Sequence, residues 1–261
     1  MTRPHANAGR APWRAAALAL LCTLPLAAAL SAPPAHAQDT AREAEAALRT
    51  PATALPPGAA VASAHTLATQ AGIDILAQGG NAFDAAVAVS AVLSVVEPIS
   101  SGLGGGGFFL LHDARTGRDV FIDARETAPA AATPAEYLDK DGNFNRDRAT
   151  NGPWSAGIPG LPAGLVYLAR EHGRLPLSVS LAPAIRIARE GFPVYSRLSR
   201  GYASRREVME RFPGTRAVFL ADGDPPEDGE RLVQPDLART LERIAQDGHD
   251  GFYRGPTAKA L

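Results

Sequence analysis

Residues 100–129 have the sequence SSGLGGGGFFLLHDARTGRDVFIDARETAP, and this stretch decides the fold of the chain. Residues 108–112 and 120–124 are apolar runs rich in aromatic and branched side chains, and a polar segment containing Gly117 separates them. Two such runs around a turn signal predict paired β-strands. Before the first strand, another backbone or a small ligand can approach residues that lack side chains: Gly102, Gly104, Gly105, Gly106 and Gly107. We therefore predict a buried hairpin that follows a glycine-rich loop.

Arg125 comes directly after the second predicted strand and is the candidate functional residue. A guanidinium is always charged and offers five donors in a rigid fork, which suits bidentate binding of a carboxylate. The alternative is that Arg125 pairs with Glu126 or Asp123 and only ends the strand. Spacing alone leaves both interpretations open.

The N-terminus has the pattern of a secretory signal peptide. Three arginines precede an apolar run over residues 15–30, and Ala35-His36-Ala37 has the small-x-small form of a processing site. A membrane anchor is the alternative, but Pro25 interrupts a run that is short for spanning a bilayer. We expect cleavage after residue 37, a periplasmic or secreted product, and no stable membrane span.

The predicted mature chain is acidic and has no cysteine. Removing residues 1–37 removes three arginines and no acidic residue, so the formal charge changes from −1 to −4. This balance gives no support to nucleic-acid binding. Cys22 is the only cysteine and lies in the removed segment, so disulfide and thiol chemistry are not expected. Residues 38–57 are predicted to be a flexible leader, and residues 58–261 one domain.

Helices are predicted on both sides of the hairpin. Residues 63–77 have helical apolar spacing, and Asn81 is placed to cap a second helix over 82–96 that is apolar on nearly every face. A helix of that kind must be buried, and the hairpin follows it directly, which favours helices packed on a sheet rather than a helical bundle. Further helices are predicted at 178–190, 196–212 and 235–247, and a packed loop at 154–164.

Several common chemistries lack their sequence patterns. Gly102-x-Gly104-x-x-Gly107 matches a dinucleotide fingerprint, but a helix precedes it and a strand follows, which is the reverse of the required context. The histidines lack zinc-type spacing, and the acidic stretch 221–229 lacks the ligand alternation of a calcium-binding EF-hand. No Gly-x-Ser-x-Gly elbow is present. We therefore predict no metal and no cofactor.

Several motifs in a fixed order resemble the large-subunit half of gamma-glutamyltransferases, from about residue 58 to residue 261. These motifs are Asn81-Ala-Phe-Asp-Ala-Ala86, Val96-Glu-Pro98, Gly102-Leu-Gly-Gly-Gly-Gly-Phe108, Asp123-Ala-Arg-Glu-Thr-Ala-Pro129, Gly157-Ile-Pro-Gly160 and Gln234-Pro-Asp-Leu-Ala238. The resemblance implies an α+β fold of the N-terminal nucleophile hydrolase kind, an αββα four-layer sandwich that is incomplete in this chain. It also implies a precursor that cuts itself into a large and a small chain.

The resemblance further implies γ-glutamyl transfer or hydrolysis on glutathione and related γ-glutamyl compounds. In such enzymes the new N-terminal threonine of the small chain is the nucleophile, and its own α-amine can serve as base. The arginine of the Arg-Glu-x-Ala-Pro motif, here Arg125, holds the α-carboxylate of the γ-glutamyl group. This chain contains no Thr-Thr pair, and Gly255–Leu261 looks like a helix that stops after one turn. We therefore expect a truncated chain that carries Arg125 as the substrate-binding residue, needs a small subunit from the same precursor, and has no turnover alone.

Two alternatives remain at this stage. A related acylase acting on glutaryl β-lactams would use the same nucleophile and would also need an arginine for a distal carboxylate. A degenerate secreted fragment that only binds glutamyl compounds, or binds nothing, is the non-catalytic alternative.

Overall fold

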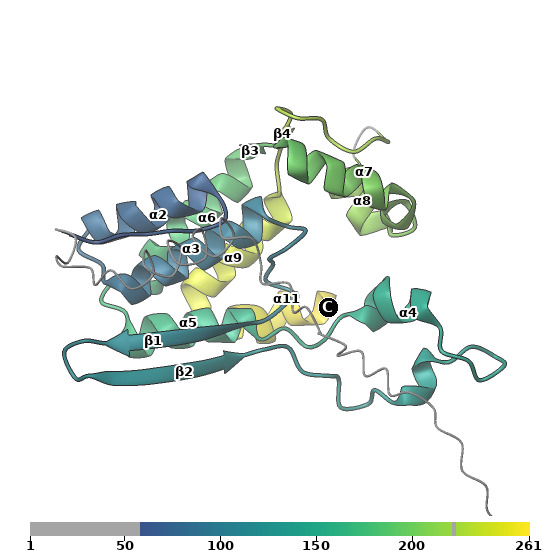
Figure 1. Ribbon diagram of the computed structural model, residues 1–261, viewed down its shortest axis with the longest axis horizontal. Helices are drawn as coiled ribbons and strands as arrows, with labels where there is room; N and C mark the ends of the chain where they lie inside the picture. The colour runs from purple at the N-terminus through teal and green to yellow at the C-terminus, as the bar shows by residue number, and fades with distance from the viewer. Residues whose placement is uncertain (1–57, 221–222) are drawn as a thin grey trace, which may run out of the picture. The chain divides into compact units, whose positions relative to one another are not determined.

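The computed structural model describes residues 58–220 and 223–261 (Figure 1). The predicted signal peptide and leader, residues 1–57, lie outside the described residues. Four helices pack side by side and form most of the core: α2 (Thr66–Ala77), α3 (Ala82–Val96), α6 (Leu177–Glu190) and α9 (Pro235–Asp247). Contacts run from α2 to α3, from α3 to α6, and from α6 to α9. The central helix, α3, is the apolar one, because only a helix surrounded by other elements can bury every face.

Asn81 caps the start of α3, as the sequence predicts, and Asp84 completes a capping box. The Asn81 side chain accepts hydrogen bonds from the backbone N–H groups of Phe83 and Asp84. The Asp84 carboxylate in turn accepts from the Asn81 backbone N–H at 2.9 Å. Asp84 is fully buried and also accepts from the backbone N–H of Arg174 at 2.9 Å, so the cap joins α3 to the connection before α6.

The hairpin consists of β1 (Gly107–Asp113) and β2 (Arg118–Ala124), paired antiparallel from Gly107 opposite Ala124 to Asp113 opposite Arg118. Gly117 has a φ of +66°, a backbone conformation that glycine adopts without strain, so it supplies the predicted turn. The inner face of the hairpin packs on α5 (Leu161–His172). This pair of strands confirms the prediction at 108–112 and 120–124.

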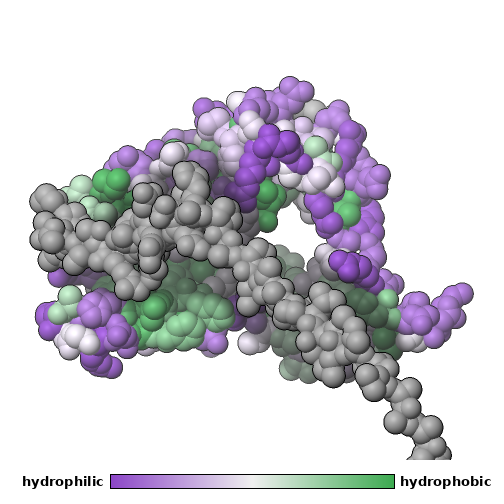
Figure 2. Space-filling model, viewed as in Figure 1, coloured by the Kyte–Doolittle hydropathy of each residue, from purple (hydrophilic) through white to green (hydrophobic). Residues whose placement is uncertain are grey.

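The outer face of the hairpin is exposed, and the prediction of a buried hairpin is wrong for this face. Phe108, Leu110 and Phe121 point outward and are 56%, 79% and 61% exposed. Figure 2 shows this apolar surface beside the polar turn that joins the two strands. We call these three residues the outer hairpin patch. Among the described residues only one face of the hairpin is covered, so the strands are more apolar than a hairpin with one solvated face requires.

Helix-on-helix packing is more extensive than predicted. The helix α3 contacts α2, α5 and α6, whereas the hairpin is covered mainly by α5. The prediction of a loop over 154–164 is correct only in part, because α5 begins at Leu161 with Pro162 in its first turn, where proline is tolerated. The prediction over 196–212 corresponds to α7 (Ser196–Glu210), and those over 178–190 and 235–247 correspond to α6 and α9.

The remaining elements are short. They are η1 (Pro134–Tyr137), α4 (Arg146–Thr150), η2 (Pro153–Ser155), β3 (Phe192–Pro193), α8 (Pro213–Phe219), β4 (Arg231–Leu232), α10 (Asp250–Tyr253) and α11 (Gly255–Ala260). The segment that carries α4 is joined to the end of α7, because the Arg211 guanidinium donates to both carboxylate oxygens of Asp147 at 3.0 Å. The strands β3 and β4 form a second, two-residue antiparallel pair.

Candidate functional site

Arg125 lies immediately after β2, with its guanidinium open to solvent. Its side chain is 59% exposed, and the nearest carboxylate oxygen with which it pairs, Glu126 Oε1, is 3.7 Å from Nη2. That distance is beyond hydrogen-bond range. Asp123 accepts a hydrogen bond from the Arg125 backbone N–H at 2.9 Å, not from the guanidinium. Among the described residues the guanidinium therefore has no hydrogen-bond acceptor, and its five donors are available.

Phe108 holds the guanidinium from one side. The Arg125 Cζ atom lies 5.8 Å from the centroid of the Phe108 ring, which in turn stacks on Phe121 at 5.4 Å. A cation over an aromatic face is attracted by the ring quadrupole without using any N–H donor. The contact therefore limits where the arginine points while leaving its fork free.

Glu126 is the residue that sequence reasoning considered only as a partner for Arg125. Its Oε2 atom is buried and has no hydrogen-bond partner among the described residues. Burying a carboxylate oxygen without a partner is unfavourable, and such an atom calls for an explanation. The signal in the sequence is only the adjacency of the two residues, which does not distinguish a surface pair from a site.

Glycines surround the backbone of residues 124–127 and allow it to be approached closely. A Cβ atom on Gly106 would lie 2.3 Å from Glu126 Oε2, and one on Gly160 would lie 2.4 Å from the Ala124 carbonyl oxygen. A Cβ on Gly157 would lie 3.0 Å from the Thr127 carbonyl oxygen. The predicted close approach to the glycine-rich segment is thus confirmed at Gly106, where the neighbour is the backbone that carries the arginine.

Backbone hydrogen bonds join the same three segments. The N–H groups of Gly160 and Leu161 donate to the Gly105 carbonyl oxygen at 3.0 and 3.1 Å. Thr127 and Ile158 exchange backbone hydrogen bonds as an isolated antiparallel bridge. The glycine-rich loop, the segment after β2 and the start of α5 are therefore joined by backbone hydrogen bonds, and we call them the glycine collar, defined as residues 102–107, 124–127 and 157–161.

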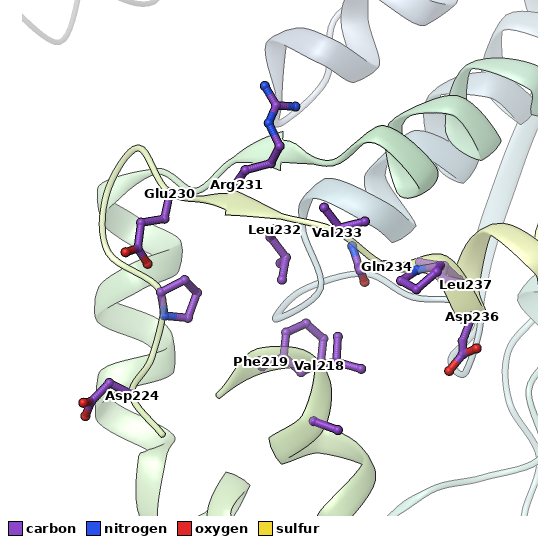
Figure 3. A pocket seen from close by; sticks show the side chains of 13 residues that line it. Val218, Phe219, Asp224, Glu230, Arg231, Leu232, Val233, Gln234, Asp236 and Leu237 are labelled. Carbon is purple, nitrogen blue, oxygen red and sulfur yellow. The ribbon is translucent and has the colours of Figure 1, made fainter. Parts of the chain in front are cut away.

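A sizeable cavity in the described part of the chain lies elsewhere. Its volume is about 760 Å³, and it is lined by residues of α8, the 224–230 segment, β4 and the beginning of α9. Figure 3 shows Val218 and Phe219 facing Leu232 across this cavity, while the Arg231 guanidinium points away from it. None of the lining residues belongs to the glycine collar, so this cavity is not the space in front of Arg125.

Metal and membrane signals are absent from the described residues. No group of three histidine, cysteine, aspartate or glutamate side chains is arranged to hold a metal ion in residues 58–220 and 223–261. Within the same ranges, no helix is long and apolar enough to cross a membrane. The histidines have local roles: His65 caps α2 by accepting from the Leu67 N–H, and His112 pairs with Asp119 on the hairpin surface.

Comparison with known proteins decides the family. A sequence model of gamma-glutamyltranspeptidase matches residues 68–261, which include the whole glycine collar. The chain belongs to the gamma-glutamyltranspeptidase family. It is 42% identical over 204 residues to the glutathione hydrolase proenzyme of Bacillus subtilis (strain 168), a match that covers 77% of this chain and 34% of that protein. The chain thus spans about a third of the length of the curated relatives it matches.

Solved structures agree with this assignment. The gamma-glutamyltranspeptidase of Helicobacter pylori matches 79% of this chain and 59% of its own with a TM-score of 0.76 and 36% identity. A cephalosporin acylase from Bacillus halodurans matches 79% of this chain and 41% of its own with a TM-score of 0.67 and 31% identity. Gamma-glutamyltranspeptidases are N-terminal nucleophile hydrolases, and the mixture of helices and strands confirms the predicted α+β fold class.

Proposed function

We propose that this chain, as residues 58–261, is the part of a γ-glutamyltransferase or glutathione hydrolase that binds the head group of the substrate. The supporting observation is the Arg125 guanidinium on the glycine collar, 59% exposed and without a hydrogen-bond acceptor among the described residues, in a chain of the gamma-glutamyltranspeptidase family. A planar fork of donors suits a carboxylate, and the hydrogen-bonded collar fixes the backbone from which Arg125 reaches it. The substrate class is glutathione and other γ-glutamyl compounds.

Glu126 supplies the second half of the recognition. The head group of a γ-glutamyl compound carries both an α-carboxylate and an α-ammonium. Arg125 would bind the carboxylate, and the neighbouring Glu126 carboxylate would accept from the ammonium. The two side chains are adjacent in sequence and oppositely charged, and Arg125 Nη2 lies 3.7 Å from Glu126 Oε1. Paired opposite charges match the two charges of a zwitterion, which provides specificity as well as affinity.

The bond-breaking group belongs to a partner. A small chain from the same precursor would present an N-terminal threonine, whose hydroxyl oxygen attacks the γ-glutamyl carbonyl carbon. The threonine Oγ–carbonyl bond forms, the amide C–N bond breaks, and the hydroxyl proton passes through the threonine α-amine to the leaving amine. Water or an acceptor amine then takes the γ-glutamyl group from the threonine. The chain alone is predicted to show no turnover.

The outer hairpin patch is the surface that this small chain would cover. Phe108, Leu110 and Phe121 together form an apolar face on a two-stranded sheet. Such faces are normally packed against a second layer. Strands of the small chain would supply that layer and would bring the threonine to the end of the hairpin where Arg125 lies.

Export accompanies this function. We propose that residues 1–37 are a signal peptide, that residues 38–57 are a leader, and that the mature protein is periplasmic or secreted, because the charged, apolar and small-residue segments occur in the order of an exported precursor. The intact mass of the secreted product tests this directly. A mass that begins at Gln38 supports the proposal, and one that retains Met1 contradicts it.

Acylase activity toward glutaryl amides is the second candidate, favoured by the similarity to the Bacillus halodurans cephalosporin acylase. A glutaryl group has a distal carboxylate but no ammonium, so it would use Arg125 and offer Glu126 no ammonium to bind. Competition between a γ-glutamyl anilide and a glutaryl amide, measured on the complete two-chain enzyme, separates the two. Preference for the glutaryl substrate would overturn the first proposal.

Replacement of Arg125 by Lys tests the site itself. Lysine keeps the charge but loses the fork, and a charge-assisted hydrogen bond contributes about 1.5–3 kcal/mol. KM for a γ-glutamyl anilide should therefore rise by about tenfold or more in the complete enzyme. An unchanged KM would remove Arg125 from the site.

A further inference from the structure

Glu97 is a buried carboxylate at the end of α3 that the proposed chemistry does not use. Its side chain is only 3% exposed, and its Oε2 atom has no hydrogen-bond partner among the described residues. Its position is the last one before the segment that leads into the glycine-rich loop, and its carbonyl oxygen accepts from the backbone N–H groups of Ser100 and Ser101 at 2.8 Å. The residue therefore lies where the direction of that loop is set.

Two side chains at the start of α7 approach the Glu97 carboxylate. The Tyr195 hydroxyl donates to Oε1, and the Arg197 Nη1 atom lies 3.6 Å from Oε2. The same guanidinium donates through Nη2 to the Ser100 hydroxyl oxygen at 3.3 Å. Arg197 thus connects the buried charge to the first residues of the loop.

The loop continues from Ser100 to the glycine collar without a break. Gly105 accepts the hydrogen bonds from the start of α5, and Gly106 lies against the Glu126 carboxylate. A shift at Ser100 would therefore be passed along a few residues to the group beside Arg125. Displacements of about 1 Å in a binding site can reduce activity up to a hundredfold.

Stability alone gives no reason for a charge at position 97. Burial of the Glu97 carboxylate costs desolvation free energy, and a partner that is 3.6 Å away and 60% exposed returns only part of it; an uncharged residue of the same volume is often neutral or more stable. Arg197 is 60% exposed, so it would stay hydrated if Glu97 lost its charge. Removing Arg197 instead would leave the Glu97 carboxylate buried without its counter-charge. Removal of the Glu97 charge and removal of Arg197 should therefore have different effects on the stability of the chain, and unfolding measurements can show this difference.

We infer that Glu97 and Arg197 form a positioning pair that holds the glycine-rich loop against Glu126 and so sets the affinity of the site for the γ-glutamyl head group. This inference rests on the proposed function. The pair touches no reacting atom in the proposed chemistry, and it acts through Ser100 and the loop. It should consequently affect substrate binding more than the chemical step.

The test compares Glu97→Gln and Arg197→Met in the complete two-chain enzyme, with Arg200→Met as the matched control. Arg200 is an exposed arginine on the same helix and makes no ion pair among the described residues. We expect KM for a γ-glutamyl anilide to rise about threefold to tenfold in both test variants, with kcat within twofold of the parent, and no change in the control. The double variant should resemble either single variant, since the residues act as one unit.

Thermal unfolding of the 261-residue chain provides a readout independent of activity. Glu97→Gln should leave the midpoint unchanged or raise it, whereas Arg197→Met should lower it. Arg197→Lys keeps the charge, so its KM should lie closer to that of the parent enzyme than to that of Arg197→Met. If KM rises only in Arg197→Met, the variant with the lower unfolding midpoint, and stays at the parent value in Glu97→Gln, the role of the pair is merely structural. That result would overturn the inference.

Failure of the inference and failure of the proposed function are distinguishable. If Arg125→Lys raises KM while Arg197→Met and Glu97→Gln leave it unchanged, the positioning pair is wrong and the head-group site stands. If Arg125→Lys leaves KM unchanged, the proposed site is wrong, and the inference fails with it.

Discussion

Substitution of a single glycine should disrupt the glycine collar, and its neighbour in the same loop provides the control. A Cβ on Gly106 would lie 2.3 Å from Glu126 Oε2, 2.5 Å from the Glu126 nitrogen and 2.6 Å from the Ala124 carbonyl oxygen. Ordinary contacts of a Cβ begin at 3.4 Å, so two backbone atoms and a carboxylate must each move by about 1 Å. Overpacking of that kind typically costs about 1–3 kcal/mol.

Gly104→Ala separates this cost from the general effect of replacing glycine. A Cβ on Gly104 has no neighbour within 4 Å, and the residue does not have a left-handed φ. Both substitutions reduce the entropy of the unfolded chain equally, which stabilises by about 0.4–1 kcal/mol. The difference between the two variants therefore isolates the overpacking, and we expect Gly106→Ala to be less stable than Gly104→Ala by about 1–3 kcal/mol.

Urea unfolding of the chain, followed by circular dichroism, measures this difference as a shift of the midpoint at constant slope. The same two variants in the complete enzyme should differ in KM for γ-glutamyl substrates, with only Gly106→Ala impaired. Equal midpoints for the two variants would refute the packing described around Ala124 and Glu126. A lower midpoint for Gly104→Ala would also refute it.

Three further predictions concern other parts of the molecule. Glu126→Gln should reduce the preference for γ-glutamyl over glutaryl amides by about tenfold, because a charge-assisted contact to the α-ammonium is lost. Competition kinetics measures this ratio, and an unchanged ratio would exclude Glu126 from head-group recognition. Leu110→Asp should weaken assembly with the small chain by about 2 kcal/mol or more, since burial of a leucine contributes about 1.5–3 kcal/mol. The midpoint of urea unfolding of the isolated chain should stay nearly unchanged. Unaltered assembly would contradict the proposed interface. Burial lowers the pKa of His65 below its usual value, and the nearby Glu97 charge only partly opposes this. The unfolded chain therefore binds more protons, and the free energy of unfolding should fall as the pH drops from about 7 to 5. His65→Asn should reduce this fall, which unfolding curves at the two pH values measure. An identical pH dependence in the variant would contradict the partial burial of His65.

Local signals predicted the elements that depend on nearby residues. The Asn81 cap of α3 and the hairpin turn at Gly117 follow from a few neighbouring side chains and backbone angles, and both are present. The beginning of α5 at Leu161 was missed, because Pro162 and the adjacent glycines resemble a loop in sequence and a helix start in structure. Its helical form is supported by packing on the hairpin, which is a tertiary effect.

The site could be predicted only in part for the same reason. Arg125 was identified from its residue type and its place after a strand, and the structure leaves its guanidinium without an acceptor among the described residues. The buried oxygen of Glu126 and the pairing of Glu97 with Arg197 depend on segments far apart in the sequence. Their burial is set by the glycine-rich loop and α7, which no local pattern brings together.

Affinity arithmetic indicates that the head-group site should not function before assembly. A dissociation constant of 1 mM requires a binding free energy of about −4.1 kcal/mol. Contacts to Arg125 and Glu126 would contribute at most about 1.5–3 kcal/mol each, and less at side chains that are 59% and 33% exposed to water. Association itself costs about 4 kcal/mol or more. Titration of the isolated chain with millimolar glutathione should therefore show no measurable binding by calorimetry.

Assembly with the small chain would change this balance, because covering the outer hairpin patch removes water from around Arg125. Charged contacts strengthen as the surrounding dielectric falls. An inactive two-chain form, with the nucleophilic threonine replaced by alanine, should bind glutathione where the isolated chain does not. Equal affinity in the two forms would mean that the head group is recognised by this chain alone, and the role proposed for the small chain would then be limited to supplying the nucleophile.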